Sequence, residues 1–417
     1  MKRQDRLLRC LLAAGLTLGA AGAGRAQTEA SADGQLRWMT QTPGGVEPLR
    51  ADWIREDDEA RYETASGEPG LVAAKATLVR VRDRFVMAID ADSPEAEWPE
   101  VIRFDFTGEG NFADAPSLPL RLNKHNRGFV ARFEGNVEVP RDGQTQTVRV
   151  SGYYYLVNDE HYLRLGLRSA AGATVEIGGE PHQVVLLDGD NDLDVTTVPQ
   201  REDHPDGSLR HMTRGDTVLV YPDPQDLGQA VVKGYWGQPV QVGGRWYDLS
   251  LDEASRTVSA EPVELKLGTV EVDYPEWELV LVGREHIMVL RSQDGSEQEV
   301  PADEYSVLQY ELSAGEPVAG HRGQIAAHGW NVNPGTTQYA VNPGEATQVG
   351  LGEPLTVTVK SEKWGADRLN LTLAVTDVNG ADVDPPMLPG RQRPAAPRFE
   401  VADAEGQTVY SGQFEYG

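Results

Sequence analysis

Residues 76–89 read ATLVRVRDRFVMAI, two apolar runs with alternating pattern on either side of Arg82-Asp83. Alternation with period two sends successive side chains to opposite faces of a strand. A short polar break between two such runs is typical of a hairpin. The stretch therefore predicts two antiparallel strands joined by a tight turn.

The same alternation recurs along the rest of the chain, and Gly, Pro, Asp and Asn gather between the runs. No stretch of helical periodicity exceeds about two turns. The pattern predicts an all-β protein of two or three antiparallel β-sandwich-like domains. Further strands are expected at 101–106, 128–139, 146–157, 162–168, 216–221, 245–251, 276–283, 286–291, 354–360, 369–376 and 407–416.

The first 26 residues have the three-part order of an export signal. A basic head at residues 2–9 precedes a short apolar run at 10–24, and small residues flank a cut after Ala26. We expect residues 1–26 to be removed and the protein to be exported, to the periplasm or the extracellular space. No later apolar run is long enough for a membrane span, so none is expected after signal removal.

The charge of the chain excludes one class of partner. The 417 residues carry 38 Lys and Arg against 65 Asp and Glu, a formal net charge of −27. Loss of the signal removes five bases and one acid, which changes the net charge to −31. Nucleic acid is therefore not an expected partner, because phosphate binding needs a basic surface. The single cysteine, Cys10, lies in the signal, so the mature chain has no thiol for disulfides or catalysis.

Turn-rich, polar stretches divide the mature chain. We expect an acidic, partly extended N-terminal segment at 27–70 and a β domain with acidic loops at 71–196. A second β domain, or a continuation of the first, is expected at 197–315. Residues 316–417 then have the length of one small sandwich.

This last segment resembles immunoglobulin-like and fibronectin III-like modules. The resemblance rests on its Gly-rich turns, on the strand PLTVTV at 354–359 and on the closing stretch VYSGQFEY at 409–416. It implies an immunoglobulin-like sandwich at 316–417, without a Cys…Trp…Cys signature. Modules of this kind usually hold, space or bind other molecules, an implication that comes by analogy from the fold.

The most chemically specific segment follows the apolar run 184–187 and reads DGDNDLD at 188–194. Oxygen ligands at alternate positions suit calcium, which takes six to eight oxygens. The loop resembles the Asp-x-Asp-x-Asp loops of EF-hands, dockerins and thrombospondin type 3 repeats. The resemblance makes Asp188, Asp190 and Asp192 the first three ligands and gives Asp194 a backbone carbonyl ligand. It departs from the family at the sixth position, where Leu193 replaces glycine, and at the twelfth, where a proline replaces glutamate.

A second acidic loop resembles the same families. Asp105, Thr107 and Glu109 take its ligand positions and Gly110 its sixth position, whereas Pro116 replaces the glutamate at the twelfth. Calcium is the cofactor that both loops imply. The alternative for both is a plain turn, since turns between strands use the same residue types. A weaker echo at 377–382 is expected to be a hairpin turn.

Catalytic motifs are not found. The sequence has no G-x-S-x-G, no H-E-x-x-H and no phosphate-binding glycine loop. His204 with His211, and His321 with His328, are candidate zinc pairs; ordinary surface histidines are the alternative.

Aromatic side chains are candidates for stacking on sugars. In the run 153–155, alternation sends Tyr153 and Tyr155 to one face of a strand and Tyr154 to the other, so at least one face is expected to be core.

The sequence thus favours an exported binding or scaffolding protein stabilised by calcium, and not an enzyme. One alternative is a carbohydrate-active hydrolase with accessory sandwiches, which needs a carboxylate pair at a set separation. The other is a structural or adhesive component of the cell envelope. The expected partner is carbohydrate or another envelope or extracellular protein.

Overall fold

The computed structural model describes residues 34–39, 53–54, 60–65, 68–73, 76–81, 85–125, 128–141, 144–157, 160–189, 193–213, 215–227, 230–314, 324–330, 338–352, 354, 356–363, 369–378, 382–384 and 395–414. This part of the chain consists of strands, turns and loops and contains no helix. The all-β prediction is therefore confirmed. Among the described residues no helix is long and apolar enough to cross a membrane. The predicted export signal lies outside them.

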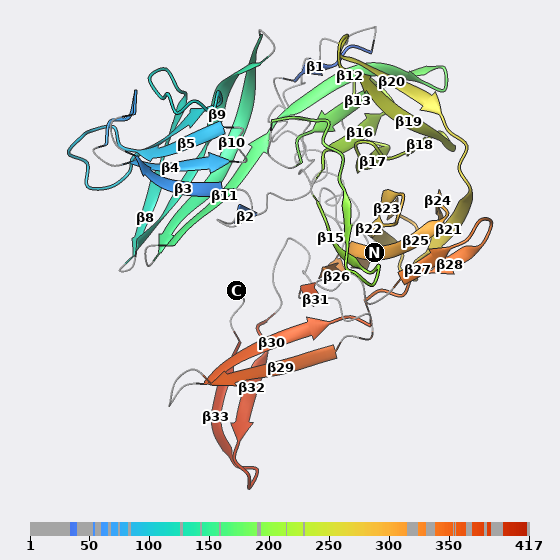
Figure 1. Ribbon diagram of the computed structural model, residues 1–417. Helices are drawn as coiled ribbons and strands as arrows, with labels where there is room; N and C mark the ends of the chain where they lie inside the picture. Colours follow the sequence, from blue (N-terminus) through green and yellow to red (C-terminus); the bar gives the residue numbers. More distant parts are fainter. Residues whose placement is uncertain are drawn as a thin grey trace, which may run out of the picture.

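Two five-stranded sheets form a first sandwich (Figure 1, left). Their inward side chains share one core, which includes Phe104, Phe133, Tyr154 and Leu165. The predicted hairpin is present as β4 and β5. One sheet contains β3 (Ala60–Ala65), β4 (Ala76–Val81), β5 (Phe85–Asp90), β6 (Val101–Asp105) and β7 (Ser117–Pro119). The other contains β2 (Trp53–Ile54), β8 (Arg121–His125), β9 (Gly128–Arg141), β10 (Gln144–Val157) and β11 (Glu160–Arg168).

A second sandwich packs a five-stranded sheet on a three-stranded sheet around a core that includes Val184, Val220 and Trp236. The short N-terminal strand β1 belongs to it, because β1 pairs with β12 and Gln35 forms a bridge with Thr257. The first sandwich is thus inserted in sequence between two parts of the second. The first sheet contains β1 (Arg37–Trp38), β12 (Ala170–Ile177), β13 (Glu180–Leu187), β16 (Thr217–Tyr221) and β17 (Val232–Tyr235); the second contains β18 (Val240–Val242), β19 (Arg245–Asp252) and β20 (Thr257–Pro262).

A third core lies between another three-stranded sheet and an eight-stranded sheet and includes Trp277, Tyr305, Tyr310 and Leu312. Strand β21 pairs antiparallel with β24 and parallel with β28. The small sheet contains β24 (Gln298–Pro301), β21 (Leu267–Glu271) and β28 (Ala346–Gln348). The large sheet contains β23 (Ile287–Ser292), β22 (Glu276–Val282), β25 (Asp303–Ala314), β26 (Gln324–Trp330), β31 (Asp382–Asp384), β30 (Leu369–Thr376) and β29 (Thr356–Lys363), with β27 (Gln338–Val341) paired to β25.

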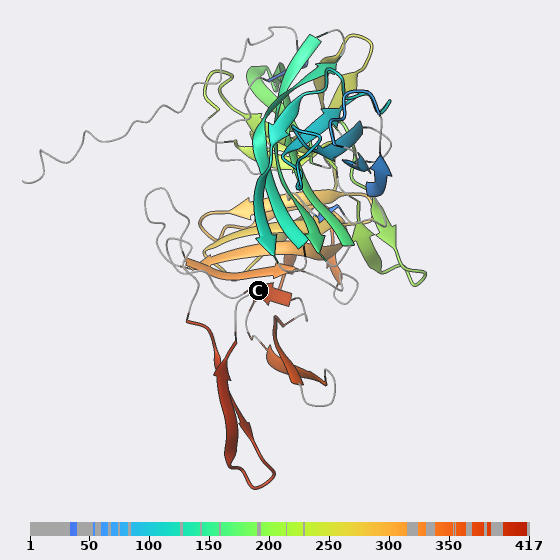
Figure 2. The same cartoon turned by 90° about the vertical axis from the view of Figure 1, so that its left-hand side faces the viewer.

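Two hairpins extend from this third sandwich at the bottom of the views (Figure 2). Strand β29 pairs with β30, and every side chain of β29 is exposed. Strands β32 (Arg398–Ala402) and β33 (Thr408–Gln413) pair with each other. The resemblance of 316–417 to an immunoglobulin-like module remains a prediction.

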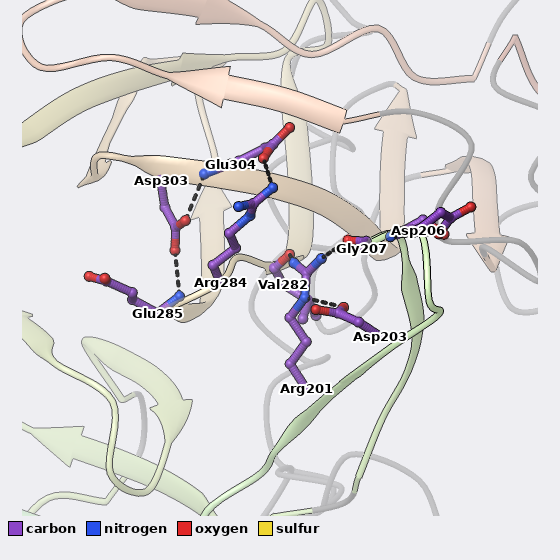
Figure 3. A network of polar contacts seen from close by, with 10 residues as sticks. Arg201, Asp203, Asp206, Gly207, Val282, Arg284, Glu285, Asp303 and Glu304 are labelled. Atoms are coloured by element: carbon purple, nitrogen blue, oxygen red, sulfur yellow. Dashed lines mark hydrogen bonds and ion pairs between the residues drawn. The ribbon is translucent and has the colours of Figure 1, made fainter.

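The second and third sandwiches are joined by a shared apolar cluster and by polar contacts. Tyr235 of β17 and Val280 and Val282 of β22 pack in one cluster with Leu209. Leu209 begins β15 (Leu209–Met212), which pairs with β14 (Arg201–Asp203). The Arg201 side chain donates to the carbonyl of Val282 across this joint and to the Asp203 carboxylate beside it, at 3.3 and 2.6 Å (Figure 3).

Candidate functional site

The first acidic loop follows β6 and is closed by its own first residue. Asp105 is 4 % exposed, and its carboxylate accepts hydrogen bonds from the amide and hydroxyl of Thr107, at 2.9 and 2.6 Å. It also accepts from the amides of Gly110 and Asn111, at 2.6 and 3.2 Å. Burial opposes ionisation of this carboxyl, but these four donors outweigh it and hold the pKa of Asp105 below its usual value.

The second acidic loop follows β13. Asp188 is 2 % exposed, and its Oδ2 accepts from the hydroxyl of Ser169 at 3.3 Å and from the amide of Leu193 at 2.9 Å. The Asp194 carboxylate accepts from the amides of Val195 and Thr196, at 2.7 and 3.2 Å. The predicted ligands Asp190 and Asp192 lie outside the described residues.

The two loops share two features, which concern their first and sixth residues. In each, the first aspartate accepts a hydrogen bond from the amide of the sixth residue, Gly110 or Leu193. Both sixth residues have positive φ, 81° for Gly110 and 68° for Leu193. Glycine adopts this conformation without strain, whereas leucine does not. The sixth residue is therefore left-handed in both loops, glycine in one and leucine in the other.

The conformation of Leu193 places its side chain in the core of the first sandwich. Leu193 is 8 % exposed and belongs to the cluster that includes Phe104 and Phe133. The rest of its loop follows β13 of the second sandwich, and Val195 packs in the second core. The 188–194 loop is therefore a contact between the two sandwiches.

A further buried aspartate supports this loop. Asp216 directly precedes β16, is fully buried, and accepts from the amide of Gly189 at 2.8 Å and from that of Thr197 at 2.5 Å. Because Leu187 of β13 pairs with Thr217 of β16, Asp188 and Asp216 stand at the ends of neighbouring strands. Two buried aspartates thus lie at neighbouring strand ends, and the sequence had singled out only Asp188. The sequence did contain a signal for both: an acidic residue lies next to each of the apolar runs that form β13 and β16.

The two predicted loops follow strands of different sandwiches, one after β6 of the first and the other after β13 of the second. Glu109 and Thr107 are exposed. No group of three or more His, Cys, Asp or Glu side chains in metal-binding proximity occurs among the described residues, a set that excludes Asp190 and Asp192.

The remaining candidates can be placed in part. Asp377, which begins the weaker echo, is buried and accepts from the hydroxyl of Tyr310 at 2.9 Å. The strands on either side of this echo, β30 and β31, pair antiparallel, as expected of a hairpin. Among the histidine pairs, His321 and the side chains of His211 and His328 lie outside the described part.

Two other carboxyls have structural partners. Asp90 is 1 % exposed and accepts from the amide of Ala73 and from the guanidinium of Arg103, both at 2.8 Å. Burial opposes its ionisation, but these bonds outweigh it and lower its pKa. Asp303 accepts from the amides of Glu304 and Glu285 at 2.7 and 2.9 Å, and its pKa is lowered in spite of its burial.

The outer face of the sheet β2-β11-β10-β9-β8 carries arginine and tyrosine. Tyr154 is buried in the core at 1 % exposure, whereas Tyr153 and Tyr155 lie on the opposite, outer face, as predicted. The Arg132 guanidinium lies over the Tyr153 ring, 5.8 Å from its centroid. Sequence reasoning missed the arginines, because their gathering depends on the register of four strands.

Comparisons with protein families, with curated proteins and with solved structures find no match to this chain.

The Asp105 loop allows a direct test. Asp105→Ala leaves three backbone amides and one hydroxyl without their acceptor, so the free energy of unfolding is expected to fall by about 2–4 kcal/mol. Glu109→Ala removes an exposed carboxylate of the same loop and is expected to change it by less than about 0.5 kcal/mol. Urea unfolding of both variants measures the difference. Equal effects would show that the four hydrogen bonds contribute nothing to stability.

Proposed function

We propose that this chain is an exported, non-catalytic binding or scaffolding protein in which calcium, bound by the 188–194 loop, fixes the joint between the first two sandwiches. The observation that carries the proposal is the geometry of Leu193. Its amide donates to Asp188, its φ is positive, and its side chain lies in the core of the first sandwich. An ion in this loop would therefore stabilise an inter-sandwich contact.

The charge at this joint favours a cation. Asp188 and Asp216 are 2 % and 0 % exposed at neighbouring strand ends. Buried carboxylates lose hydration and repel one another, so a nearby positive charge lowers their free energy. The loop resemblance assigns Asp188, Asp190 and Asp192 to the ion, with Asp194 adding a carbonyl oxygen. Carboxylate and carbonyl oxygens are the ligands that calcium prefers.

The 105–111 loop, in contrast, is held without an ion in this proposal. A carboxylate has about four acceptor sites, and Asp105 already accepts four hydrogen bonds. Calcium would have to displace donors that close the loop. The loop therefore serves as a matched control for 188–194.

The acids with shifted pKa values favour binding over hydrolysis. In the described part of the chain every Asp or Glu with a resolved shift has a lowered pKa, and Asp90, Asp105 and Asp303 accept backbone amides. A glycosidase acid needs a raised pKa to keep its proton near neutral pH. These groups are suited to hold loops and not to donate protons.

A second candidate function is supported by the C-terminal hairpins. Val357 on β29 and Val409 and Tyr410 on β33 are exposed by 62, 63 and 62 %. Exposed apolar side chains of this kind favour a surface that packs on another molecule. This supports the structural or adhesive reading of the C-terminal segment, whose resemblance to immunoglobulin-like modules implies the same role.

Thermal melting of the mature chain, residues 27–417, tests the calcium proposal. With calcium at about 100 times its Kd, binding adds about 2.7 kcal/mol, so the Tm is expected to rise by about 5–10 °C over the chelator sample. Asp188→Asn and Asp192→Ala should each abolish this rise, and Asp105→Asn should retain it. A wild-type Tm that calcium leaves unchanged would overturn the metal site.

A further inference from the structure

We propose that the outer face of strands β8 to β11 binds an acidic polysaccharide through arginine and tyrosine side chains. This inference deepens the proposed binding function and rests on it, because it names the class of partner. It depends on the first sandwich alone and does not require calcium.

The strand register assembles the face. Arg121, Arg132, Tyr153 and Arg164 are successive cross-strand partners on β8, β9, β10 and β11, so they form one row across the sheet. In the adjacent row Tyr155 pairs with Tyr162. Directly opposed side chains on one face lie within contact distance. The sheet therefore presents guanidinium groups and aromatic rings side by side.

The face is accessible and rich in arginine. The side chains of Arg132 and Arg149 are 55 and 53 % exposed, and Tyr162 is 40 % exposed. Among the described side chains that point outward from these four strands, the charged ones are Arg121, Arg132, Arg149, Arg164, Glu134 and Glu138. These described side chains are thus four arginines and two glutamates, in a chain of net charge −27.

Contacts within the face hold the central groups in position. Glu134 accepts from Arg132 at 3.2 Å and from Arg149 at 2.5 Å, so one carboxylate orients two guanidinium groups and balances only one. Arg132 is also held over the Tyr153 ring. The rings of Tyr153 and Tyr155 are tilted by 31° with centroids 6.2 Å apart. Such pre-positioning reduces the entropy lost when a ligand binds.

These groups match the chemistry of an acidic sugar chain. Guanidinium groups bind carboxylate or sulfate oxygens in a paired geometry. Tyrosine offers an apolar ring for the carbon face of a sugar and a hydroxyl for its polar edge. The long strands β9 and β10 give the sheet an extended face, which suits a linear polymer.

Charge complementarity selects the polymer. The strongly negative remainder of the chain repels polyanions, so an acidic ligand is expected to prefer this face over others. Nucleic acid carries a phosphate on every nucleotide and needs a larger basic surface than four arginines beside two glutamates provide. A polysaccharide with one carboxylate on every second sugar has a charge density closer to that of the face.

The test is a calorimetric titration of the mature chain with a hyaluronan octasaccharide. It is carried out at 25 and at 150 mM NaCl, with chelator present. We expect saturable binding that weakens at the higher salt concentration. An Arg132→Gln/Arg149→Gln double variant should lose about tenfold or more in affinity. The matched control, Arg398→Gln on β32, removes an exposed arginine elsewhere and should stay within about twofold of wild type.

Three results would overturn the proposal: no binding at 25 mM NaCl, equal losses in the double variant and in Arg398→Gln, or tighter binding of a single-stranded oligonucleotide than of the octasaccharide. Unchanged Tm values for the variants show that lost affinity does not come from unfolding. Because chelator is present throughout, failure here leaves the calcium-dependent melting result intact, and the two proposals fail separately.

Discussion

Replacing Asp303 with alanine is expected to lower the free energy of unfolding by about 3–5 kcal/mol. The Asp303 carboxylate accepts from the amides of Glu285, His286 and Glu304, at 2.9, 3.1 and 2.7 Å, and its side chain is 7 % exposed (Figure 3). One side chain thus closes the turn between β22 and β23 onto the start of β25. Its loss leaves three amides without this acceptor, and each such loss costs about 1–3 kcal/mol when water cannot replace it.

The ion pair beside Asp303 provides a matched control. Arg284 donates to Glu304 at 2.6 Å, but the side chains are 62 and 39 % exposed. Glu304→Gln should therefore cost less than about 1 kcal/mol. The loss in free energy of unfolding for Asp303→Asn should lie between the losses for Asp303→Ala and Glu304→Gln. An amide keeps one acceptor oxygen, but its NH₂ group faces the remaining donors. Urea unfolding at pH 7 measures all three, and an Asp303→Ala loss no larger than that of Glu304→Gln would contradict the argument.

The same carboxylate makes stability depend on pH. Burial raises the pKa of Asp303, but the nearby His286 side chain and the amides lower it more, so the folded pKa is below the unfolded value of about 4. A group with a depressed folded pKa contributes its full stability above the unfolded pKa and loses it as pH falls. The stability difference between wild type and Asp303→Ala should therefore be constant above about pH 5 and shrink at lower pH.

Leu193→Gly is expected to be more stable than Leu193→Ala, the reverse of the usual order. Either change removes a buried leucine side chain from the core of the first sandwich, a loss of about 2–4 kcal/mol. At φ 68°, however, alanine keeps a strain of about 1–2 kcal/mol that glycine does not have. The free energy of unfolding of Leu193→Gly should therefore be about 1 kcal/mol higher than that of Leu193→Ala.

Leu186 is the control for this comparison. It is fully buried in β13, where alanine should be the better replacement because glycine weakens a strand. Calorimetric melting of the glycine and alanine variants at positions 193 and 186 measures which replacement is more stable at each position. If glycine is also the worse replacement at position 193, the left-handed conformation does not determine the stability of the joint.

The sequence predicted what depends on local pattern. The hairpin at 76–89 and the strand at 369–376 appear where alternation places them, because period two is visible within one strand. Strand β12 is not among the strands expected from alternation, since its AAGA start has little alternation; it pairs along its length with β13 and at two residues with β1, far earlier in the chain. The small residues at the start of β12 do not show from the sequence which face of the strand is buried.

The features of the candidate site also differ in whether a short stretch of sequence shows them or strand pairing determines them. The sequence marked Asp105 and Asp188 as the first residues of two acidic loops, because the residue types of a loop are visible in a short window; the calcium ligation assigned to them stays a prediction. The burial of Asp216 beside Asp188 and the row from Arg121 to Arg164 depend on which strands are neighbours. Pairing register is a long-range property that a short window does not contain.

The N-terminal strand imposes an order on assembly. Arg37 of β1 pairs with Gly172 of β12, and the whole first sandwich lies between them in sequence. Synthesis delivers β1 early, yet its pairing partner β12 is made only after strands β2 to β11. Until then, Leu36, which is 3 % exposed in the finished protein, has no core to enter. Pairing β1 with β12 therefore closes a loop of more than a hundred residues, and a loop of this length costs more entropy to close than a hairpin does.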